Sequence, residues 1–410
     1  MTEPNRIVIV GAGLAGASVS AAVREQGFSG SVVLIGQDRH RPYELPPLSK
    51  GILLGETEEP DWVHAADFYA EHDIELRTST VVREVRLGDR MVVEESGTEH
   101  AYDRLVLATG SAPRRLAVPG ADLDGLRTLR TLDDSRDLRG QLTDGVRVVV
   151  VGAGWIGCEV AAAARTNGAD VTVVDPLSLP LRQVMGDTVG TVFRELHAER
   201  GVTWRLGVGV AGFTGTGRVS GVELADGSTL PADVVLVAVG ASARLELARA
   251  AGLELSDAVP GGGVAVDAGL RAAAPDVFAV GDVAAHLHPR YGRRLRVEHW
   301  SNAKDQGTHV AGNLLGASEP YAASPYFFSD QYDLGLEMRG LADPATDELV
   351  VRGDLSAREF IAFWLRDGQV AAALNVNSWD DGDALSTLVD KEITVEPSQL
   401  TDGDLAALTG

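Results

Sequence analysis

Short runs of apolar, mostly β-branched residues divide the chain into predicted strands, turns and helices. The run that ends at Val10 predicts a buried strand, and the Ala-rich stretch Ala17–Glu25 after it predicts a helix. Ser31–Ile35 then predicts a second strand. The same order recurs around another Ala-rich stretch, with strands predicted at Val146–Val151 and Asp170–Val174. Two strand–helix–strand units of this kind indicate an α/β fold.

Other apolar segments complete the expected elements. Further strands are expected at Ile74–Thr78, Val81–Val85, Met91–Glu94, Asp233–Val239 and from Tyr102 into a small-residue turn that ends at Gly110. The prolines of Arg41–Lys50 exclude the interior of a strand or helix, so this segment is expected to be a rigid loop. From about Tyr321 alternating segments suggest a small antiparallel sheet, followed by a short helix and a tail: Phe360–Arg366, Gln369–Leu374 and Glu396–Gly410.

A glycine-rich turn precedes the first helix and contains Gly11, Gly13 and Gly16. In a dinucleotide-binding turn the first glycine allows the tight turn and the second lets the backbone approach a pyrophosphate. The third allows close packing of helix and strand. The amino end of the helix adds N–H groups and the positive end of the helix dipole. A glycine-rich turn alone is more often only a turn, but its place between a strand and a helix predicts dinucleotide binding.

The second unit repeats this pattern with Gly152, Gly154 and Gly157. Its next strand ends in Asp175, whose carboxylate could bind both ribose hydroxyls of NADH and repel the 2′-phosphate of NADPH, or could be an exposed loop acid. Two complete units imply two dinucleotides, most economically FAD and a nicotinamide coenzyme.

Residues at the ends of other predicted strands are candidates for the first dinucleotide. Asp38, about 20 residues past the glycines, could bind a ribose or could be a loop aspartate. The small residues Ala108–Gly110 would let a flat cofactor lie close to the backbone. At Gly281 a strand turns and presents Asp282 at a predicted helix start, where the carboxylate could accept hydrogen bonds from a polyol or could cap the helix.

Composition narrows the functional classes. At 410 residues two or three domains are expected, and the net charge of −23 argues against nucleic-acid or anionic-membrane partners. No apolar run reaches membrane-spanning length, so a cytoplasmic location is expected. The single cysteine, Cys158, excludes a disulfide or dithiol centre within the chain and is expected to be a small packing residue. Among the scattered histidines, His286 and His288 are expected to be loop residues rather than metal ligands.

Several ordered motifs together resemble the oxygenase-coupled NADH–ferredoxin reductases, the putidaredoxin reductase and rubredoxin reductase group. The resemblance runs from about Ile7 to about Leu374. Its most specific parts are Leu45–Lys50, Leu129–Asp134, Trp155–Glu159, Val297–Ala303 and Phe328–Tyr332. The family usually has Trp where Phe328 stands.

The resemblance implies a glutathione-reductase-like fold with two Rossmann-type domains and a C-terminal α+β domain. An FAD-binding domain would be split over residues 1–111 and 241–320 around an NAD-binding domain at 112–240, and residues 321–410 would cover the flavin and help to dock a partner. The implied function is an FAD-dependent NADH:ferredoxin oxidoreductase that supplies a cytochrome P450 or a ring-hydroxylating oxygenase through a [2Fe-2S] or similar ferredoxin. The alternatives are an NADH oxidase or peroxidase, and a sensing flavoprotein like apoptosis-inducing factor.

Lys50 and Glu159 are the candidate catalytic residues, expected to form an ion pair beside the flavin. Alternatively, Glu159 could stand at a helix start only because a negative charge is favourable near the positive end of the helix dipole. The candidate cofactor-binding residues, from the turns, the strand ends and the resemblance together, are Gly11, Gly13, Leu14, Ala15, Gly16, Asp38, Arg41, Lys50, Val82, Ala108, Thr109, Gly110, Arg130, Gly152, Gly154, Ile156, Gly157, Glu159, Asp175, Gly240, Gly281, Asp282, Glu298, His299 and Trp300.

A basic segment is the candidate docking site for the ferredoxin. Tyr291-Gly292 is expected to form a hairpin turn that places the neighbouring arginines at the surface, namely Arg290, Arg293, Arg294 and Arg296. Ferredoxins of this kind are usually acidic, so association with a chain of net charge −23 needs a local basic surface. The alternative is a solvated basic hairpin that balances nearby acids.

Overall fold

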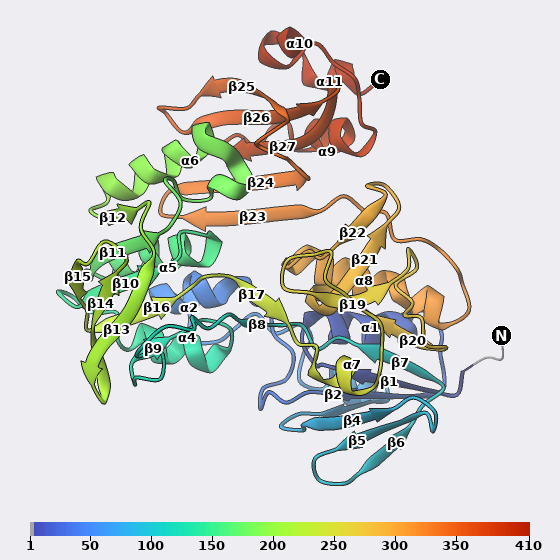
Figure 1. Cartoon of the computed structure of the whole chain (residues 1–410). Coiled ribbons are helices and arrows are strands. Elements are labelled where there is room, and N and C mark those ends of the chain that lie inside the picture. The colour runs from blue at the N-terminus through green and yellow to red at the C-terminus, as the bar shows by residue number, and fades with distance from the viewer. Residues whose placement is uncertain (1–3) are drawn as a thin grey trace. The chain divides into compact units, whose positions relative to one another are not determined.

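The computed structural model describes residues 4–410 and divides them into two compact units (Figure 1). The first unit contains the described residues up to Glu44, Pro60–Ala112 and Ala241–Ala323. The second contains Leu45–Glu59, Pro113–Gly240 and Ser324–Gly410. Each unit is therefore assembled from three separate stretches of sequence. The division into three domains at the boundaries given above stays a prediction.

A five-stranded parallel sheet forms the centre of the first unit. Its order is β20-β7-β1-β2-β3, with bounds Val277–Ala279, Arg104–Leu107, Arg6–Val10, Ser31–Ile35 and Ile74–Arg77. Residues 7 to 10 of the central strand are all buried, because parallel strands are covered on both faces. The helices α1 (Leu14–Glu25) and α8 (Trp300–Leu314) pack side by side (Figure 1). A Cβ at Gly307 of α8 would lie 2.5 Å from the Ala15 carbonyl oxygen, so glycine permits this close packing.

Smaller elements complete the first unit. One antiparallel sheet contains β4 (Val82–Arg86), β5 (Met91–Glu94) and β6 (Glu99–Ala101). Another sheet has the order β18-β19-β21-β22, with bounds Leu255–Ser256, Gly263–Val266, Ala284–His288 and Arg293–Leu295. The short helices are α3 (Phe68–Glu71), α7 (Glu246–Ala250) and the 3-10 turn η2 (Gly281–Val283). The two-stranded sheet β8 (Ser111–Pro113) and β17 (Ala241–Ala243) lies where the chain leaves this unit and returns to it.

The second unit contains another five-stranded parallel sheet. Its order is β12-β11-β10-β16-β9, with bounds Thr203–Leu206, Asp170–Asp175, Arg147–Val151, Val234–Val237 and Leu126–Arg127. The main helices are α5 (Trp155–Thr166) and α6 (Arg182–Glu199). Shorter elements are η1 (Pro46–Ser49), α2 (Gly51–Leu54), α4 (Leu132–Arg139), β13 (Val210–Thr216), β14 (Arg218–Leu224) and β15 (Thr229–Pro231).

The C-terminal part of the second unit is an antiparallel sheet in the order β23-β24-β27-β26-β25, with bounds Tyr326–Gln331, Leu334–Gly340, Gln369–Val376, Glu359–Arg366 and Glu348–Asp354. One face of this sheet shares a core with α5 and α6, in which Trp364 and Leu336 pack in one cluster with Cys158 and Phe193. The other face is covered by α9 (Gly382–Asp390), α10 (Pro397–Asp402) and α11 (Leu405–Leu408).

Most expected elements are confirmed, and the differences are local. His286 and His288 lie buried on strand β21, so their expected loop position is wrong. Asp282 lies in the first turn of a short 3-10 helix that leads into β21, so the helix predicted to start there is only a single 3-10 turn. The proline loop contains η1, since a proline fits the first turn of a helix. The tail forms two short helices instead of one, whereas Cys158 is a fully buried packing residue as expected.

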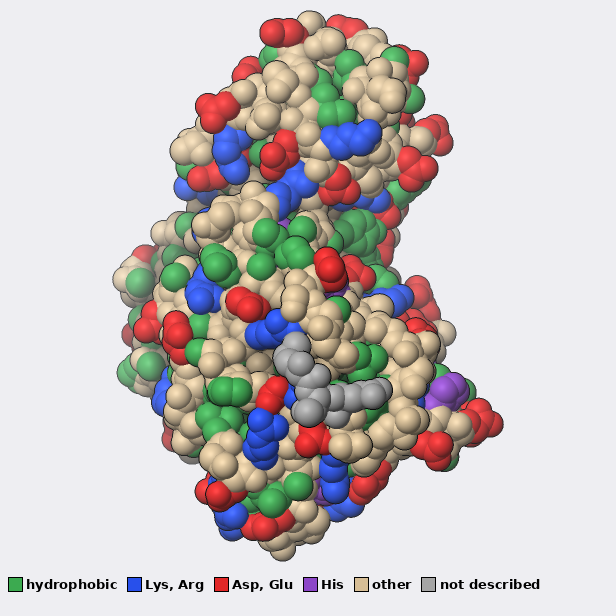
Figure 2. Space-filling model, turned by 90° about the vertical axis from the view of Figure 1, so that its right-hand side faces the viewer, with side chains coloured by type: hydrophobic (Ala, Val, Ile, Leu, Met, Phe, Trp, Pro, Cys, Tyr) green, Lys and Arg blue, Asp and Glu red, His purple; other side chains and the backbone are tan. Residues whose placement is uncertain are grey.

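No helix within residues 4–410 has the length and hydropathy needed to cross a membrane. Acidic and basic side chains are interspersed on the face shown in Figure 2. The acidic side chains on this face are therefore spread out rather than gathered in one patch.

Candidate functional site

The first glycine turn joins β1 to α1 and has the geometry expected for a dinucleotide. Gly11 has a φ of +115°, and a Cβ there would lie 2.1 Å from the Ala108 carbonyl oxygen. A Cβ at Gly16 would lie 2.0 Å from the Gly11 oxygen, so strand and helix meet without room for a side chain. A Cβ at Gly13, in contrast, would meet no described heavy atom within 4 Å. The turn is closed on the protein side and open at the amino end of α1.

The second turn, between β10 and α5, repeats this geometry. Gly152 has a φ of +109°, and a Cβ there would lie 2.4 Å from the Ala238 oxygen. At Gly157 the distance to the Gly152 oxygen would be 2.0 Å, whereas at Gly154 no described atom lies within 4 Å. Within residues 4–410, no side chain caps α1 or α5, so their first N–H groups are available to an anion. Both turns therefore fit a pyrophosphate.

Asp175 is the last residue of β11 and lies beside the second turn. Its Oδ2 accepts a hydrogen bond of 2.7 Å from the N–H of Ala153, and Oδ1 accepts one of 2.8 Å from the N–H of Leu177. A carboxylate has about four acceptor positions, so the ribose-binding role assigned to Asp175 is compatible with these contacts.

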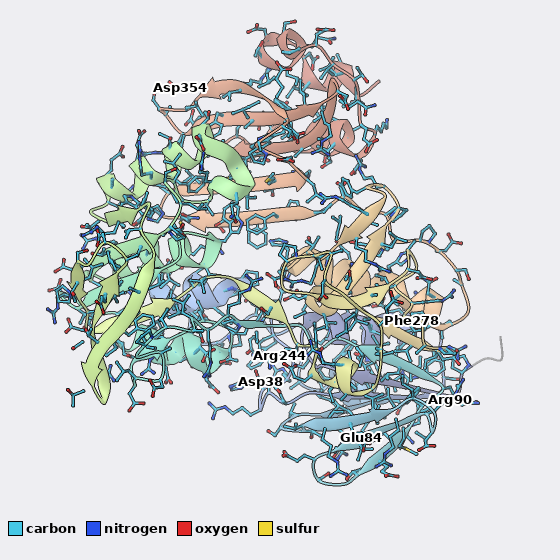
Figure 3. The ribbon with its side chains drawn as sticks, viewed as in Figure 1. Asp38, Glu84, Arg90, Arg244, Phe278 and Asp354 are labelled. Carbon is cyan, nitrogen blue, oxygen red and sulfur yellow. The ribbon has the colours of Figure 1, made fainter. Side chains whose placement is uncertain are left out.

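Asp38 lies beyond the end of β2 and is labelled in Figure 3. Its Oδ1 accepts from the N–H of His40 at 2.9 Å, and Oδ2 accepts from the Tyr43 hydroxyl at 2.9 Å. Asp38 thus stabilises its own loop, and its ribose-binding role stays a prediction. In the same part of the first unit, the Arg41 guanidinium lies 3.9 Å from the centre of the Trp62 ring.

The carboxyl ends of β7 and β20 bring several candidates together. Asp282 is buried, and its Oδ2 accepts a hydrogen bond of 2.7 Å from Ser111. Gly281 has a φ of +71°, and a Cβ there would lie 3.1 Å from that of Ala15. Thr109 donates to the Arg244 carbonyl at 3.2 Å, and the Arg244 N–H donates to the Gly110 carbonyl at 3.0 Å. Small residues and one buried carboxylate therefore lie together at the carboxyl ends of these strands, where the first glycine turn opens.

The start of α8 holds three further candidates. The His299 side chain caps the helix by accepting from the N–H of Ser301. Trp300 is the first helical residue, and burial raises the pKa of Glu44 while a hydrogen bond with Trp300 opposes that rise. Glu298 is paired with Arg296.

Lys50 and Glu159 form an ion pair within the second unit. Lys50 lies between η1 and α2, and Glu159 lies in the second turn of α5. Lys50 Nζ lies 2.8 Å from Glu159 Oε1, with side-chain exposures of 18% and 5%. The predicted ion pair is therefore present, whereas its position beside a flavin stays a prediction.

Two serines that the sequence analysis did not single out also contact Glu159. Ser49 donates to Oε2, and Ser329 on β23 donates to Oε1 at 2.6 Å. Lys50 Nζ also lies 5.6 Å from the centre of the Phe328 ring. The Glu159 carboxylate is thereby held by three donors from two parts of the chain, the adjacent residues Ser49 and Lys50 and the distant Ser329. Both serines lie inside the motifs that carried the family resemblance, which was the only signal for them.

The remaining candidates are scattered. Leu14 is buried, Val82 is buried on β4, and Ile156 on α5 is 41% exposed. The Arg130 N–H donates to Asp134 at 3.1 Å, next to the capping box of α4, and the Gly240 carbonyl accepts from the Arg114 N–H at 2.9 Å.

The arginine hairpin forms as predicted, but two of its side chains do not face solvent freely. β21 and β22 pair across a turn in which the Gly292 N–H donates to the His288 carbonyl at 3.0 Å. The Arg296 side chain is only 4% exposed and bonds to the Pro260 and Asp282 carbonyls as well as to Glu298. The expectation that Arg296 is a surface residue is therefore wrong.

The Arg294 side chain is also held by hydrogen bonds to the backbone. Its guanidinium donates to the Val266 and Ala285 carbonyls at 2.6 and 2.9 Å. Arg293 is exposed, and Arg290 lies over the Tyr291 ring at 5.7 Å. Of the four arginines, Arg293 remains the best candidate for contact with a partner.

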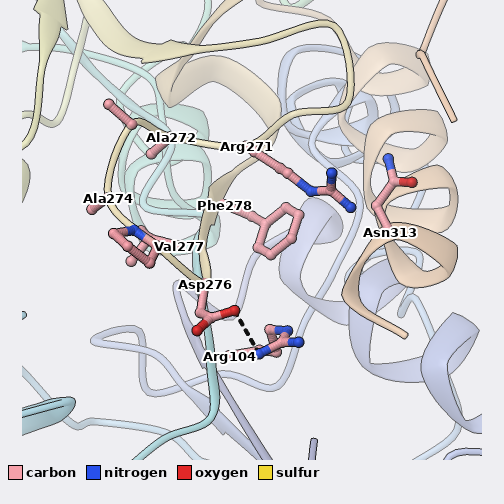
Figure 4. A pocket seen from close by; sticks show the side chains of 10 residues that line it. Arg104, Arg271, Ala272, Ala274, Asp276, Val277, Phe278 and Asn313 are labelled. Atoms are coloured by element: carbon pink, nitrogen blue, oxygen red, sulfur yellow. Dashed lines mark ion pairs between the residues drawn. The ribbon is translucent and has the colours of Figure 1, made fainter. Parts of the chain in front are cut away.

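A cavity of about 240 Å³ in the first unit lies away from the glycine turn (Figure 4). It is formed at the starts of β7 and β20, where Asp276 pairs with Arg104 at 2.6 Å. The glycine turn lies at the opposite, carboxyl ends of the strands. The cavity is therefore not the candidate dinucleotide site. Within the described residues no group of three His, Cys, Asp or Glu side chains could hold a metal.

Comparisons with known proteins agree with this geometry. Residues 5–307 match the pyridine nucleotide-disulphide oxidoreductase family, and residues 326–407 match the reductase C-terminal family. The chain is 39% identical to the ferredoxin–NAD(+) reductase component of an anthranilate 1,2-dioxygenase system from Burkholderia cepacia, over 96% of each chain. It is 36% identical to a putidaredoxin reductase from Pseudomonas putida, over 98% of this chain and 96% of the relative.

A solved structure extends the similarity to three dimensions. The crystal structure of a covalent putidaredoxin reductase–putidaredoxin complex matches with a TM-score of 0.94 and 36% identity, covering 99% of this chain and 98% of the other. The predicted family and fold class are thereby confirmed. The chain belongs to the pyridine nucleotide-disulphide oxidoreductase family and carries its reductase C-terminal domain.

Proposed function

We propose that this protein is an FAD-dependent reductase that passes electrons from NADH to a ferredoxin-type iron–sulfur protein. That protein would in turn supply a cytochrome P450 or a ring-hydroxylating oxygenase. The observation that carries the proposal is the pair of matching glycine turns, each open at a helix amino end. The similarity to reductases that act with ferredoxin and putidaredoxin supports the choice of acceptor.

Different residues of the chain would bind the two cofactors and stabilise charge on the flavin. The first turn, with Asp282 and the small residues after β7, would bind FAD, and the second turn with Asp175 would bind NADH. The bound flavin supplies the chemistry, since it accepts a hydride and returns electrons one at a time. Lys50 would stabilise negative charge on the reduced ring, and Glu159 would hold the Lys50 ammonium in place. No acid, base or nucleophile needs to form a bond with the substrate.

The single cysteine supports this assignment over a thiol-based reductase or peroxidase. Cys158 is 0% exposed within the core between α5 and the C-terminal sheet. Burial also raises the pKa of the thiol, which keeps it protonated and unreactive. A free buried cysteine also fits a reducing compartment, and we place the protein in the cytoplasm.

Steady-state oxidation of NADH tests the proposal. Turnover is measured with oxygen alone, and then with a [2Fe-2S] ferredoxin and cytochrome c as the final acceptor. We expect slow turnover with oxygen and a large stimulation by the ferredoxin. Fast oxygen turnover without stimulation would make the protein an NADH oxidase, and negligible turnover in both assays would favour a sensing flavoprotein.

A further inference from the structure

A buried chain of hydrogen bonds continues from Glu159 into the interior of the second unit. Ser329 and Gln331 lie two residues apart on β23, and both are buried. Gln331 Nε2 lies 3.2 Å from Ser329 Oγ, and Gln331 Oε1 lies 2.8 Å from Nε2 of His197 on α6. His197 is 0% exposed. Polar side chains thus connect the carboxylate beside Lys50 to a histidine in the core.

The negative charge of Glu159 determines which group donates and which accepts in every hydrogen bond from Glu159 to His197. An ionised carboxylate only accepts hydrogen bonds, so the Ser329 hydroxyl must donate to it. The Ser329 oxygen is then free to accept from the Gln331 amide nitrogen. That orientation turns the amide carbonyl toward His197, so Nε2 of the imidazole must carry the proton.

The surroundings of His197 agree with this arrangement. Nδ1 is buried and has no hydrogen-bond partner among the described residues, so an unprotonated Nδ1 avoids burying an unpaired N–H. Burial lowers the pKa of His197 to about 4, although the hydrogen bond with Gln331 opposes this. The imidazole is therefore neutral near pH 7. The rings of Tyr332 and Trp204 meet it edge-on at 5.1 and 5.6 Å and restrict its rotation.

We propose that His197 and Gln331 are positioning residues for the Lys50–Glu159 ion pair. His197 orients Gln331, Gln331 orients Ser329, and Ser329 fixes the Glu159 carboxylate toward the Lys50 ammonium. This inference rests on the proposed function, in which the ion pair acts on the flavin. Because the network is buried, removing one member leaves the next one without a hydrogen-bond partner. The loss of orientation then passes along the network to Glu159.

The tautomer of His197 is the first test, and it does not depend on turnover. The holoenzyme is labelled with ¹⁵N-histidine, and imidazole nitrogen shifts are measured by NMR from pH 6 to pH 8. The His197 signals are assigned by their loss in His197→Gln. We expect the Nε2–H tautomer over this range. An Nδ1–H tautomer would make Nε2 an acceptor, which would reverse the direction of the hydrogen bonds and overturn the proposal.

Matched variants provide the second test. Gln331→Met keeps the approximate shape of the side chain but removes both hydrogen-bonding groups, and Tyr332→Phe is the control. The Tyr332 hydroxyl is buried and has no described partner, so its removal changes the packing beside His197 without breaking the network. Flavin reduction by NADH is followed by stopped flow, and the flavin midpoint potential is measured separately.

We expect Gln331→Met to slow flavin reduction about tenfold and to shift the midpoint potential, because the ion pair loses its fixed geometry. Ser329→Ala should give a similar loss, and combining the two should add little. His197→Gln, which can still donate to Gln331, should retain more activity than His197→Phe. Tyr332→Phe should behave like wild type.

A wild-type rate and potential in Gln331→Met would overturn the proposal. Should Gln331→Met not fold, Ser329→Ala decides by the same criterion. These measurements need only NADH and the bound flavin. If Gln331→Met slows flavin reduction as expected but the wild type shows no turnover with ferredoxin, only the proposed acceptor is rejected. If the wild type turns over with ferredoxin but Gln331→Met has no effect, only the positioning role of the network is rejected.

Discussion

The carboxylate of Asp175 accepts a hydrogen bond of 2.7 Å from the backbone N–H of Ala153. This bond ties the end of β11 to the glycine turn that follows β10. The negative charge is thereby fixed next to the second dinucleotide turn, where a ribose is expected to bind.

We therefore predict that the enzyme prefers NADH to NADPH. Asp175→Asn keeps an oxygen that can accept from Ala153 but removes the charge that repels a 2′-phosphate. The ratio of kcat/KM for NADPH to that for NADH should rise roughly tenfold in this variant. Equal values of kcat/KM for the two coenzymes in the wild-type enzyme would contradict the assignment.

Lys50→Met tests the ion pair without changing the length of the side chain greatly. Loss of the ammonium leaves Glu159 as a buried, poorly compensated charge, so stopped-flow reduction of the flavin by NADH should slow by about tenfold or more, and the flavin potential should fall. Arg136→Met, at a pair in which Arg136 and Glu59 are 36% and 68% exposed, is the control and should leave both quantities unchanged. An unchanged potential in Lys50→Met would remove Lys50 from the mechanism.

The second glycine turn offers a matched pair of alanine substitutions. At Gly154 a Cβ meets no described atom within 4 Å, so Gly154→Ala should fold normally but raise KM for NADH, because the methyl group occupies the space expected for the pyrophosphate. At Gly157 a Cβ would lie 2.0 Å from a backbone oxygen, so Gly157→Ala should lower the thermal unfolding temperature. Calorimetry and NADH titration separate the two effects. Equal affinity for NADH in wild type and Gly154→Ala would place the coenzyme elsewhere.

The exposed Arg293 is predicted to contribute to ferredoxin docking. Arg293→Glu should raise KM for the ferredoxin a few-fold and weaken its dependence on ionic strength, while flavin reduction by NADH stays unchanged. Arg296→Ala should instead lower the unfolding temperature, because that guanidinium bonds to interior carbonyls. If ferredoxin KM does not respond to Arg293→Glu at any salt concentration, the docking surface lies elsewhere.

The hydrogen bonds of the buried Glu94 carboxylate lead us to predict that the protein loses stability in acid. Its carboxylate lies 2.6 Å from Arg77 Nε and 2.7 Å from His100 Nε2. Burial raises the pKa of Glu94, but these hydrogen bonds and one from Ser96 outweigh it and lower the pKa to about 2. A lowered pKa contributes stability that is present above the unfolded-state value near 4.5 and is lost as the pH falls toward 2.

Urea unfolding of wild type and Glu94→Gln between pH 5 and pH 3 measures this contribution. The free energy of unfolding of the wild type should fall by up to about 1.4 kcal/mol more per pH unit than that of the variant. Parallel curves would show that Glu94 has the same pKa in both states.

The sequence was sufficient to predict the glycine turns and their neighbouring strands because each depends on a few consecutive residues. Gly11, Gly13 and Gly16 lie in one turn, and β2 has the predicted bounds of Ser31–Ile35. The conformation at Gly11 follows from local sterics and needs no information from distant residues.

The environment of Glu159 could not be predicted in the same way. Ser49 and Ser329 lie 110 and 170 positions away in the sequence, and no periodic pattern connects them. Arg296 illustrates the opposite error. Four arginines without an acid suggest a solvated surface, but a guanidinium has five donors and can be buried where several carbonyls converge.

The core that Phe193 and Cys158 share with Trp364 also has a consequence for synthesis on the ribosome. Phe193 lies on α6, whereas Trp364 lies on β26, much later in the sequence. A nascent chain that ends before β26 has already made α5 and α6 but lacks the strand that covers their apolar faces. Such an intermediate exposes these apolar faces, so the second unit completes its folding only after β26 has been synthesised.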